Sequence, residues 1–279
     1  MATGPITTTT AAKYIAEKWT RKIEKPFYKS LYFADKVLRR DELVSDSGNK
    51  INIPFLSTFS ARDKAAGTAV TYDNETETEI ELTINKHKYL AFIIDDIVKV
   101  QTHYAVAEAY RGAQTEAVTR AMDYDLASLH ASAGTNVAGG ATTDDADMLS
   151  IVLALDLADV PQTERSGVFG AKVMNDLLNV NKYNTYDNTG KAGTATRSDN
   201  MIANVYNIDM FMSNNVVDDS TNTHNLVFHK SAVSLAVQLK PTYKMEDSVD
   251  YIGIKSVLHT IYGLAVERSA AFVDLERNS

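Results

Sequence analysis

Carboxylates are the side chains that come closest to a catalytic or metal-binding pattern in this sequence. They form two dense groups, Asp95 with Asp96, and Asp144 and Asp145 with Asp147. Paired carboxylates can act as general acid and base, or they can hold a divalent cation. Both groups, however, lie where a helix is expected to begin, and a carboxylate there accepts hydrogen bonds from free backbone N–H groups. Helix capping therefore explains both groups better than catalysis.

The six histidines are the next candidates for chemistry. None forms a pair at the i, i+4 spacing, with an intervening glutamate, that zinc peptidases use. We interpret each as a structural or surface side chain, and we expect no metal site. The histidines are His87, His103, His130, His224, His229 and His259.

No other segment carries a catalytic or cofactor-binding motif. The loop 189–194 reads Thr-Gly-Lys-Ala-Gly-Thr, but it lacks the first glycine of a phosphate-binding loop and has Ala192 where Ser or Thr should bind magnesium. No Gly-x-Ser-x-Gly sequence occurs, and without cysteine there is no thiolate nucleophile. We expect no enzymatic activity and no cofactor.

The charge is unevenly distributed along the chain. The 279 residues carry a formal charge of -8, with 28 Lys+Arg against 36 Asp+Glu. Residues 1–50 hold ten basic and six acidic residues, a balance of +4, so the remainder carries -12. A basic arm on an acidic body can contact nucleic acid or an acidic partner. The alternative is a solvated helix face, because acidic residues such as Glu17 and Glu24 are interspersed.

The N-terminal third predicts an arm, a hairpin and a long helix. In the arm, Ile15, Trp19, Ile23 and Phe27 recur every four residues, as on one side of a helix. Strands are predicted near 51–55 and 80–84, and the long polar segment between them predicts a functional loop. The apolar run 89–94 predicts a buried strand. A helix of about 50 Å is predicted over residues 97–131.

The remaining residues predict short helices and strands without regular βαβ alternation, which indicates an α+β fold. Helices are expected at 144–157, 176–181 and 231–238. Strands are expected at 168–174, 201–213, 226–228, 242–248, 257–261, 264–267 and 271–275. No apolar run is long enough to span a membrane, and the N-terminus lacks the pattern of a secretory signal.

This order of elements, together with four short stretches, resembles the major capsid proteins of tailed bacteriophages with the Hong Kong 97-like fold. The stretches are Gly48-Asn-Lys-Ile-Asn-Ile-Pro54, Phe92-Ile-Ile-Asp-Asp96, Asp209-Met-Phe-Met-Ser-Asn-Asn-Val216 and Tyr262-Gly-Leu-Ala-Val266. The resemblance implies an N-terminal arm (1–49), an extension loop (50–86) and an axial domain (144–223). It also implies a peripheral domain (87–143 and 224–279) that contains the long helix as its spine.

The function implied by the resemblance is self-assembly into the hexamers and pentamers of an icosahedral phage head around double-stranded DNA. The implied partners are copies of the chain, a portal protein, a scaffolding protein and packaged DNA bound without sequence preference, and no membrane. The implied location is the virion capsid, assembled in the host cytoplasm. Two alternatives remain open at this point: the shell of an encapsulin-type cellular compartment, and an enzyme with an unrecognised site.

The resemblance also suggests two sets of contact residues. An inward-facing arm would contact scaffold or DNA phosphates through five basic side chains. These are Lys18, Arg21, Lys22, Lys25 and Lys29. The extension loop would form salt links to an adjacent subunit through Arg62, Asp63 and Lys64.

Overall fold

The structure of this chain is a computed structural model, and its strands form three sheets. It describes residues 28–44, 48–56, 59–70, 72, 78–97, 106–180, 183, 197–198 and 201–278. The amphipathic stripe that is predicted between Ile15 and Phe27 lies outside the described residues.

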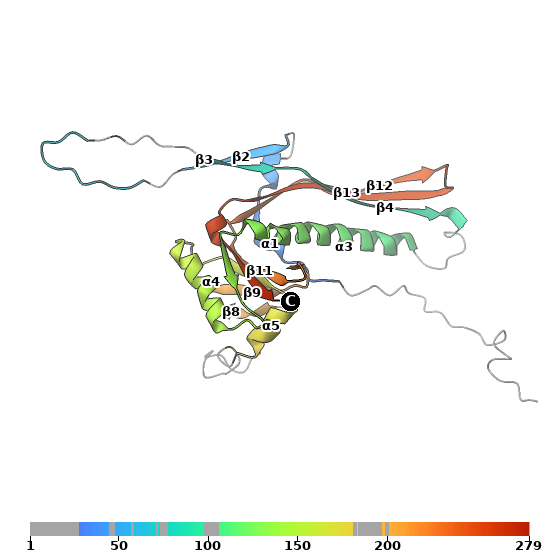
Figure 1. The fold of residues 1–279 in the computed structure, drawn as a ribbon. Helices are drawn as coiled ribbons and strands as arrows, with labels where there is room; N and C mark the ends of the chain where they lie inside the picture. The colour runs from blue at the N-terminus through green and yellow to red at the C-terminus, as the bar shows by residue number, and fades with distance from the viewer. Residues whose placement is uncertain are drawn as a thin grey trace, which may run out of the picture.

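A four-stranded sheet forms a long, narrow layer with a helix along one face (Figure 1). Its strands, in spatial order, are β1 (Leu38–Arg39), β12 (Val233–Ser248), β13 (Gly253–Val266) and β4 (Lys86–Asp95). The helix is α3 (Val106–Ala127). Strands β4 and β13 are antiparallel, and their pairing runs from Asp95 opposite Gly253 to Lys86 opposite Tyr262.

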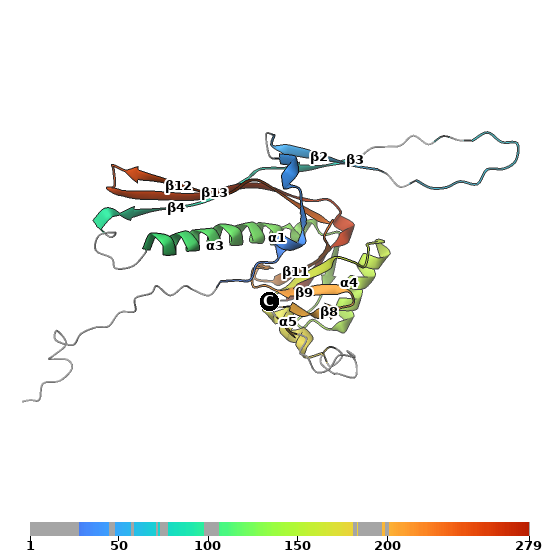
Figure 2. The ribbon, with the colours of Figure 1, turned by 180° about the vertical axis from the view of Figure 1, so that it is seen from behind.

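An eight-stranded sheet forms the body of the molecule, below one end of the long sheet (Figures 1 and 2). Its order is β5-β14-β11-β6-β9-β8-β7, with β10 paired to β11. The bounds are Thr135–Ala138 (β5), Phe272–Asn278 (β14), Asn222–His229 (β11), Arg165–Phe169 (β6), Ile208–Met212 (β9), Met201–Val205 (β8), Arg197–Ser198 (β7) and Val217–Asp218 (β10). Helices α4 (Asp145–Leu157) and α5 (Ala171–Leu178) belong to this body. Residues 87–143 and 224–279 therefore supply strands to both sheets.

Strands β2 (Lys50–Phe55) and β3 (Thr78–Thr83) form the third sheet, an antiparallel hairpin near the predicted positions. Ile53, Leu82 and Ile84 at its base pack with Val44 in a small apolar cluster of their own. The hairpin approaches β13 closely at Gly263, where a Cβ atom would lie 2.5 Å from the carbonyl oxygen of Thr83. Only glycine fits this contact without a backbone shift.

The main hydrophobic core joins the body to α3 and to the short helix α1 (Phe33–Lys36). Phe228 on β11 is almost fully buried and lies between Phe33 and Phe272, with ring centroids 6.3 Å and 6.1 Å away. The backbone N–H of Ala34 donates to Asp123 of α3 at 3.2 Å. The first described helix is thus fixed by residues that are distant in sequence.

The carboxylates at the predicted helix starts act as caps. Asp144 accepts hydrogen bonds from the N–H groups of Ala146 and Asp147, and Asp147 accepts from the N–H of Asp144, which completes a capping box. Asp95 accepts from the N–H of Ile97 at 3.0 Å. Helix α3 is described from Val106 and ends at Ala127, where a 3₁₀ turn (Ser128–Ser132) follows; residues 98–105 of the predicted helix lie outside the described residues.

Two secondary-structure predictions are wrong, one of a helix and one of a buried strand. Residues 231–238 do not form a helix, because from Val233 onward they pair with β13 on one side and with β1 at Ser234 and Leu235. This long-range pairing overrides the helix propensity of the small side chains. The run 89–94 is a strand but is not buried, since Tyr89 is 71% exposed and Ile93 46%. Helix α3 covers only the other face of β4.

Several element boundaries also differ from the prediction. The expected strand at 168–174 ends at Phe169, and α5 begins at Ala171 because Val173, Met174 and Leu177 form a buried helical face. The expected strand at 201–213 is two strands joined by a turn at Tyr206 and Asn207, both with positive φ. Conversely, the strands expected at 257–261 and 264–267 are parts of the single strand β13. In the described part of the chain, no helix combines the length and the apolar character that crossing a membrane requires.

Candidate functional site

Exposed apolar side chains gather on three parts of this molecule, and none of the three is a deep cleft. They are the loop beyond the β2–β3 hairpin, the outer face of the long sheet, and one side of α4. Large exposed apolar surfaces in soluble proteins mark sites of interaction with other molecules. The candidate functional site is therefore a set of contact surfaces.

The hairpin loop projects far beyond both larger sheets (Figure 1). Its described residues 59–70 are all exposed, including the apolar side chains of Phe59 and Val70. A turn shapes the loop near its middle, where the hydroxyl of Thr68 donates to the carbonyl of Ala65 at 2.7 Å and Gly67 has φ +82°. The loop therefore offers side chains that its own subunit does not cover.

Arg62, Asp63 and Lys64 lie together in the exposed part of this loop. Their positions suit contact with another molecule, because none of the three side chains is buried within the chain. Salt links to an adjacent subunit remain a prediction.

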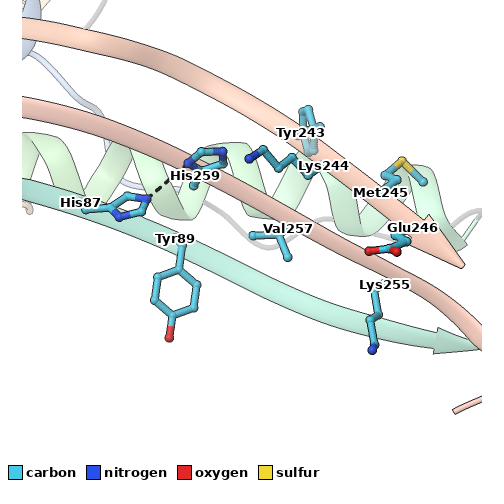
Figure 3. A pocket seen from close by; sticks show the side chains of 9 residues that line it. All are labelled: His87, Tyr89, Tyr243, Lys244, Met245, Glu246, Lys255, Val257 and His259. Atoms are coloured by element: carbon cyan, nitrogen blue, oxygen red, sulfur yellow. Dashed lines mark hydrogen bonds between the residues drawn. The ribbon is translucent and has the colours of Figure 1, made fainter. Parts of the chain in front are cut away.

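The outer face of the long sheet, opposite α3, holds a shallow groove of about 800 Å³ (Figure 3). Its lining residues are His87, Tyr89, Tyr243, Lys244, Met245, Glu246, Lys255, Val257 and His259. Of these, Tyr243 and Met245 direct their side chains to the helix side of β12, where both contact Arg111 of α3. The imidazoles of His87 and His259 approach each other at 3.3 Å between Nε2 and Nδ1. Desolvation of the ring, followed by the charge of Lys244, lowers the pKa of His259. The groove thus combines aromatic, aliphatic and charged side chains on an open surface.

Both edges of the long sheet are open at its far end in the described part of the chain. Strand β4 pairs only with β13, and β12 meets β1 only at Ser234 and Leu235. Pro241 lies on this edge portion of β12, where the pairing register shifts between Leu239 and Thr242. Unpaired strand edges can bind a further extended segment through the backbone.

Helix α4 carries a row of exposed leucines. Leu149, Leu153 and Leu157 follow the i, i+4, i+8 spacing and lie on one side of the helix. The opposite side buries Met148 and Leu155 in the core. The helix is apolar on two sides although its own subunit covers only one of them.

The structure describes only one of the basic arm residues that were predicted to contact scaffold or DNA. Of the five basic side chains predicted to contact scaffold or DNA, Lys29 alone lies within the described residues, and it is exposed. Lys18, Arg21, Lys22 and Lys25 lie outside them.

Most charged groups buried in the described structure have structural partners. Arg165 donates to Asp156 at 2.7 Å and to the carbonyls of Val160 and Pro161. Asp125 accepts from the hydroxyl of Tyr262 at 2.9 Å and lies 3.1 Å from the ammonium of Lys88. These contacts fasten helices and strands to one another.

A cluster of two histidines and one aspartate was not predicted from the sequence. The fold brings together His130, His224 and Asp274, which come from the 3₁₀ turn after α3, from β11 and from β14. Burial raises the pKa of Asp274 to about 6, and burial also lowers the pKa of His130. Sequence spacing could not reveal the cluster, because only the pairing of β11 with β14 places His224 near Asp274.

Known proteins match this chain in their solved structures. No protein-family model matches the chain, and no curated protein sequence matches it. A solved structure from Mycobacterium phage Che8 is 27% identical, with a TM-score of 0.82 over 94% of this chain and 97% of that chain. The capsid of cyanophage P-SCSP1u is 18% identical, with a TM-score of 0.78 over 95% of this chain and 93% of that chain. The mature capsid of bacteriophage PhiM1 is 14% identical, with a TM-score of 0.76 over 94% and 92%.

The chain therefore has the fold of phage capsid proteins. It resembles the major capsid proteins of tailed bacteriophages over nearly its full length, as the four sequence stretches predicted.

Proposed function

We propose that this chain assembles into the hexamers and pentamers of an icosahedral phage head that encloses double-stranded DNA. The observation that carries the proposal is the exposure of the hairpin loop, the sheet edges and the α4 leucines in a chain with the phage capsid fold. Contacts between different patches on successive subunits close into rings when the rotation between subunits fits. Many such contacts, each modest, add up to a stable shell.

In this proposal the hairpin at residues 50–86 is the extension loop and reaches a neighbouring subunit. Its charged residues Arg62, Asp63 and Lys64 form salt links there, and its apolar residues cover exposed surface on the neighbour. The outer groove of the long sheet is a suitable receiving surface, because it carries charges of both signs on Lys255 and Glu246.

We further propose that the two larger sheets correspond to the two capsid domains. The long sheet with α3 as its spine forms the peripheral domain, and the eight-stranded sheet with α4 and α5 forms the axial domain. Residues 1–49 form the arm. This division differs from the bounds 144–223 given above, because it assigns β5 and β14, which pair within the body, to the axial domain.

Electron microscopy and sedimentation of the purified chain, with and without a candidate scaffolding protein, test assembly directly. Closed shells or rings of five and six subunits are expected. A monodisperse monomer under every condition would contradict the proposal. Shells from the native host that hold a protein cargo and no DNA would favour a cellular compartment instead.

The double variant Arg62→Glu/Lys64→Glu tests the loop contact. We expect fewer closed shells with unchanged unfolding of the isolated subunit, because both side chains are exposed. The matched control Arg62→Lys/Lys64→Arg keeps the charge and should assemble normally. Loss of subunit stability in the charge-reversal variant would mean that the residues serve their own fold.

The basic arm is the proposed contact for scaffold and then for DNA, on the inner side of the shell. Neutralising Lys18, Arg21, Lys22, Lys25 and Lys29 should lower the yield of filled heads, because phosphate binding without sequence preference depends on positive charge. Neutralising the exposed Lys172 and Lys230 of the body is the control. Normal yields of filled heads in the arm variant would refute this role. A portal at one vertex and assembly in the host cytoplasm complete the proposal.

A further inference from the structure

We propose that His130, His224 and Asp274 form a binding site for a divalent transition-metal ion. Each residue offers one ligand atom, and these atoms all lie within 4.8 Å of one another. Two imidazole nitrogens and one carboxylate oxygen are a donor set that suits Zn²⁺ and its neighbours in the first transition row.

The carboxylate of Asp274 lies beside both imidazoles. Oδ2 of Asp274 lies 2.6 Å from Nδ1 of His224 and 3.6 Å from Nδ1 of His130. The two Nδ1 atoms therefore approach the same carboxylate oxygen. A metal ion bound to Nδ1 of His224 would displace the hydrogen between this nitrogen and Oδ2, and the neutral imidazole would then carry its proton on Nε2, which faces Asp219.

Unsatisfied buried atoms point to a missing ligand at this position. Asp274 is 1% exposed and its Oδ1 has no hydrogen-bond partner. His224 is 6% exposed, and its Nε2 is likewise without a hydrogen bond. Buried polar atoms in native structures are normally paired, so the unpaired Oδ1 of a carboxylate whose Oδ2 lies beside two imidazoles needs an explanation. Coordination of a cation by Asp274 supplies one.

The surroundings of His224 fit the usual second shell of a metal-bound histidine. Its Nε2 faces Oδ2 of Asp219 at 3.6 Å, on the side of the ring away from Asp274. Histidines that bind a metal through one nitrogen commonly direct the other toward a carboxylate, which fixes the orientation of the ring. A small closure of this gap would give His224 that arrangement.

Metal binding requires one local adjustment. The rings of His130 and His224 are stacked with centroids 3.7 Å apart, so they cannot both aim a nitrogen at one ion without a rotation. The side chain of His130 is 22% exposed and lies on a 3₁₀ turn, which leaves it space to turn. Solvent at this open side would supply the remaining ligand.

Such an ion would link the end of α3 to the centre of the body. His130 follows α3, whereas His224 and Asp274 belong to the adjacent strands β11 and β14 of the eight-stranded sheet. An ion that binds the folded state only stabilises it in proportion to the ion's concentration relative to Kd. The site would therefore stabilise the connection between the two parts of the subunit.

The test uses full-length, tag-free subunits that have been stripped of metal and then titrated with Zn²⁺ or Co²⁺ alone. We expect one ion per chain, a higher Tm with Zn²⁺, and visible absorption bands of nitrogen-coordinated Co²⁺. His130→Asn removes the most exposed ligand and should weaken binding at least tenfold. Asp274→Asn, which preserves the side-chain shape, should weaken it as well.

The control variants are His87→Asn and His259→Asn, which remove the histidine pair on the long sheet and should leave the affinity unchanged. Absence of binding in the folded wild-type chain would overturn the proposal. Binding that survives in His130→Asn and Asp274→Asn but is lost in the control variants would assign the ion to the other histidine pair, and it would overturn the proposal equally.

Discussion

The eight-stranded body and the far end of the long sheet differ in how much of their surface is buried by their own chain. In the body, every residue of β6 is buried, and so is every residue of β11 except its first. In the long sheet, residues 240–247 of β12 are all exposed. The body is held together by contacts within its own chain, whereas the outlying strands leave apolar surface and backbone edges uncovered. These uncovered strands are the part of the molecule that is suited to contact with other molecules.

The largest expected effect comes from the core of the body. Phe228→Ala should lower the free energy of unfolding by about 3–5 kcal/mol, because a fully buried aromatic side chain leaves a cavity between Phe33 and Phe272. Urea denaturation of the isolated subunit measures the change. Tyr89→Ala, on the exposed face of β4, is the matched aromatic control and should change stability by less than about 0.5 kcal/mol. An equal loss of stability in the two variants would contradict the contrast between the buried body and the exposed part of the long sheet.

An intermediate effect is expected where the hairpin meets the long sheet. Gly263→Ala should lower the free energy of unfolding by about 1–3 kcal/mol, because the added methyl group would overlap the backbone of Thr83. Hydrogen exchange should show faster exchange at the base of β3. Glu79→Ala, at an exposed position of the same hairpin, is the control. An unchanged Gly263→Ala protein would mean that the hairpin rests loosely on the sheet.

The smallest effect on stability is expected on the outer side of α4. Leu153→Ser should change the free energy of unfolding by about 0.5 kcal/mol or less, since the side chain is exposed, yet it should reduce shell formation. Leu155→Ala, on the buried side of the same helix, should cost about 2–5 kcal/mol. Differential scanning calorimetry measures the change in stability of each variant, and electron microscopy measures how many closed shells form. Normal shells from Leu153→Ser would exclude this side of α4 from the subunit contacts.

The sequence was informative where structure depends on local pattern. Alternation near Ile51 and Ile80 predicted both strands of the hairpin, and the carboxylates at Asp144 and Asp147 predicted the capped start of α4. Such features are encoded within a few residues, so periodicity and capping chemistry reveal them.

Features that depend on distant pairing could not be predicted in this way. The start of β12 resembles a helix in composition, and only its alignment with β1 and β13 makes it a strand. The exposure of Tyr89 depends on which face of β4 α3 covers. The cluster of His130, His224 and Asp274 requires the turn after α3 and two strands to meet. Spacing along the chain contains none of this information.

The place of strand β14 also determines when the two larger sheets can form during synthesis of the chain. Strand β14 lies inside the eight-stranded sheet, between β5 and β11, although it is the final element of the chain. The long sheet likewise depends on β13 to join β4 to β12. A nascent chain on the ribosome therefore cannot close either sheet until its C-terminal segment emerges from the exit tunnel. In the proposed assembly, a chain would therefore present its contact surfaces only after β13 and β14 have been synthesised.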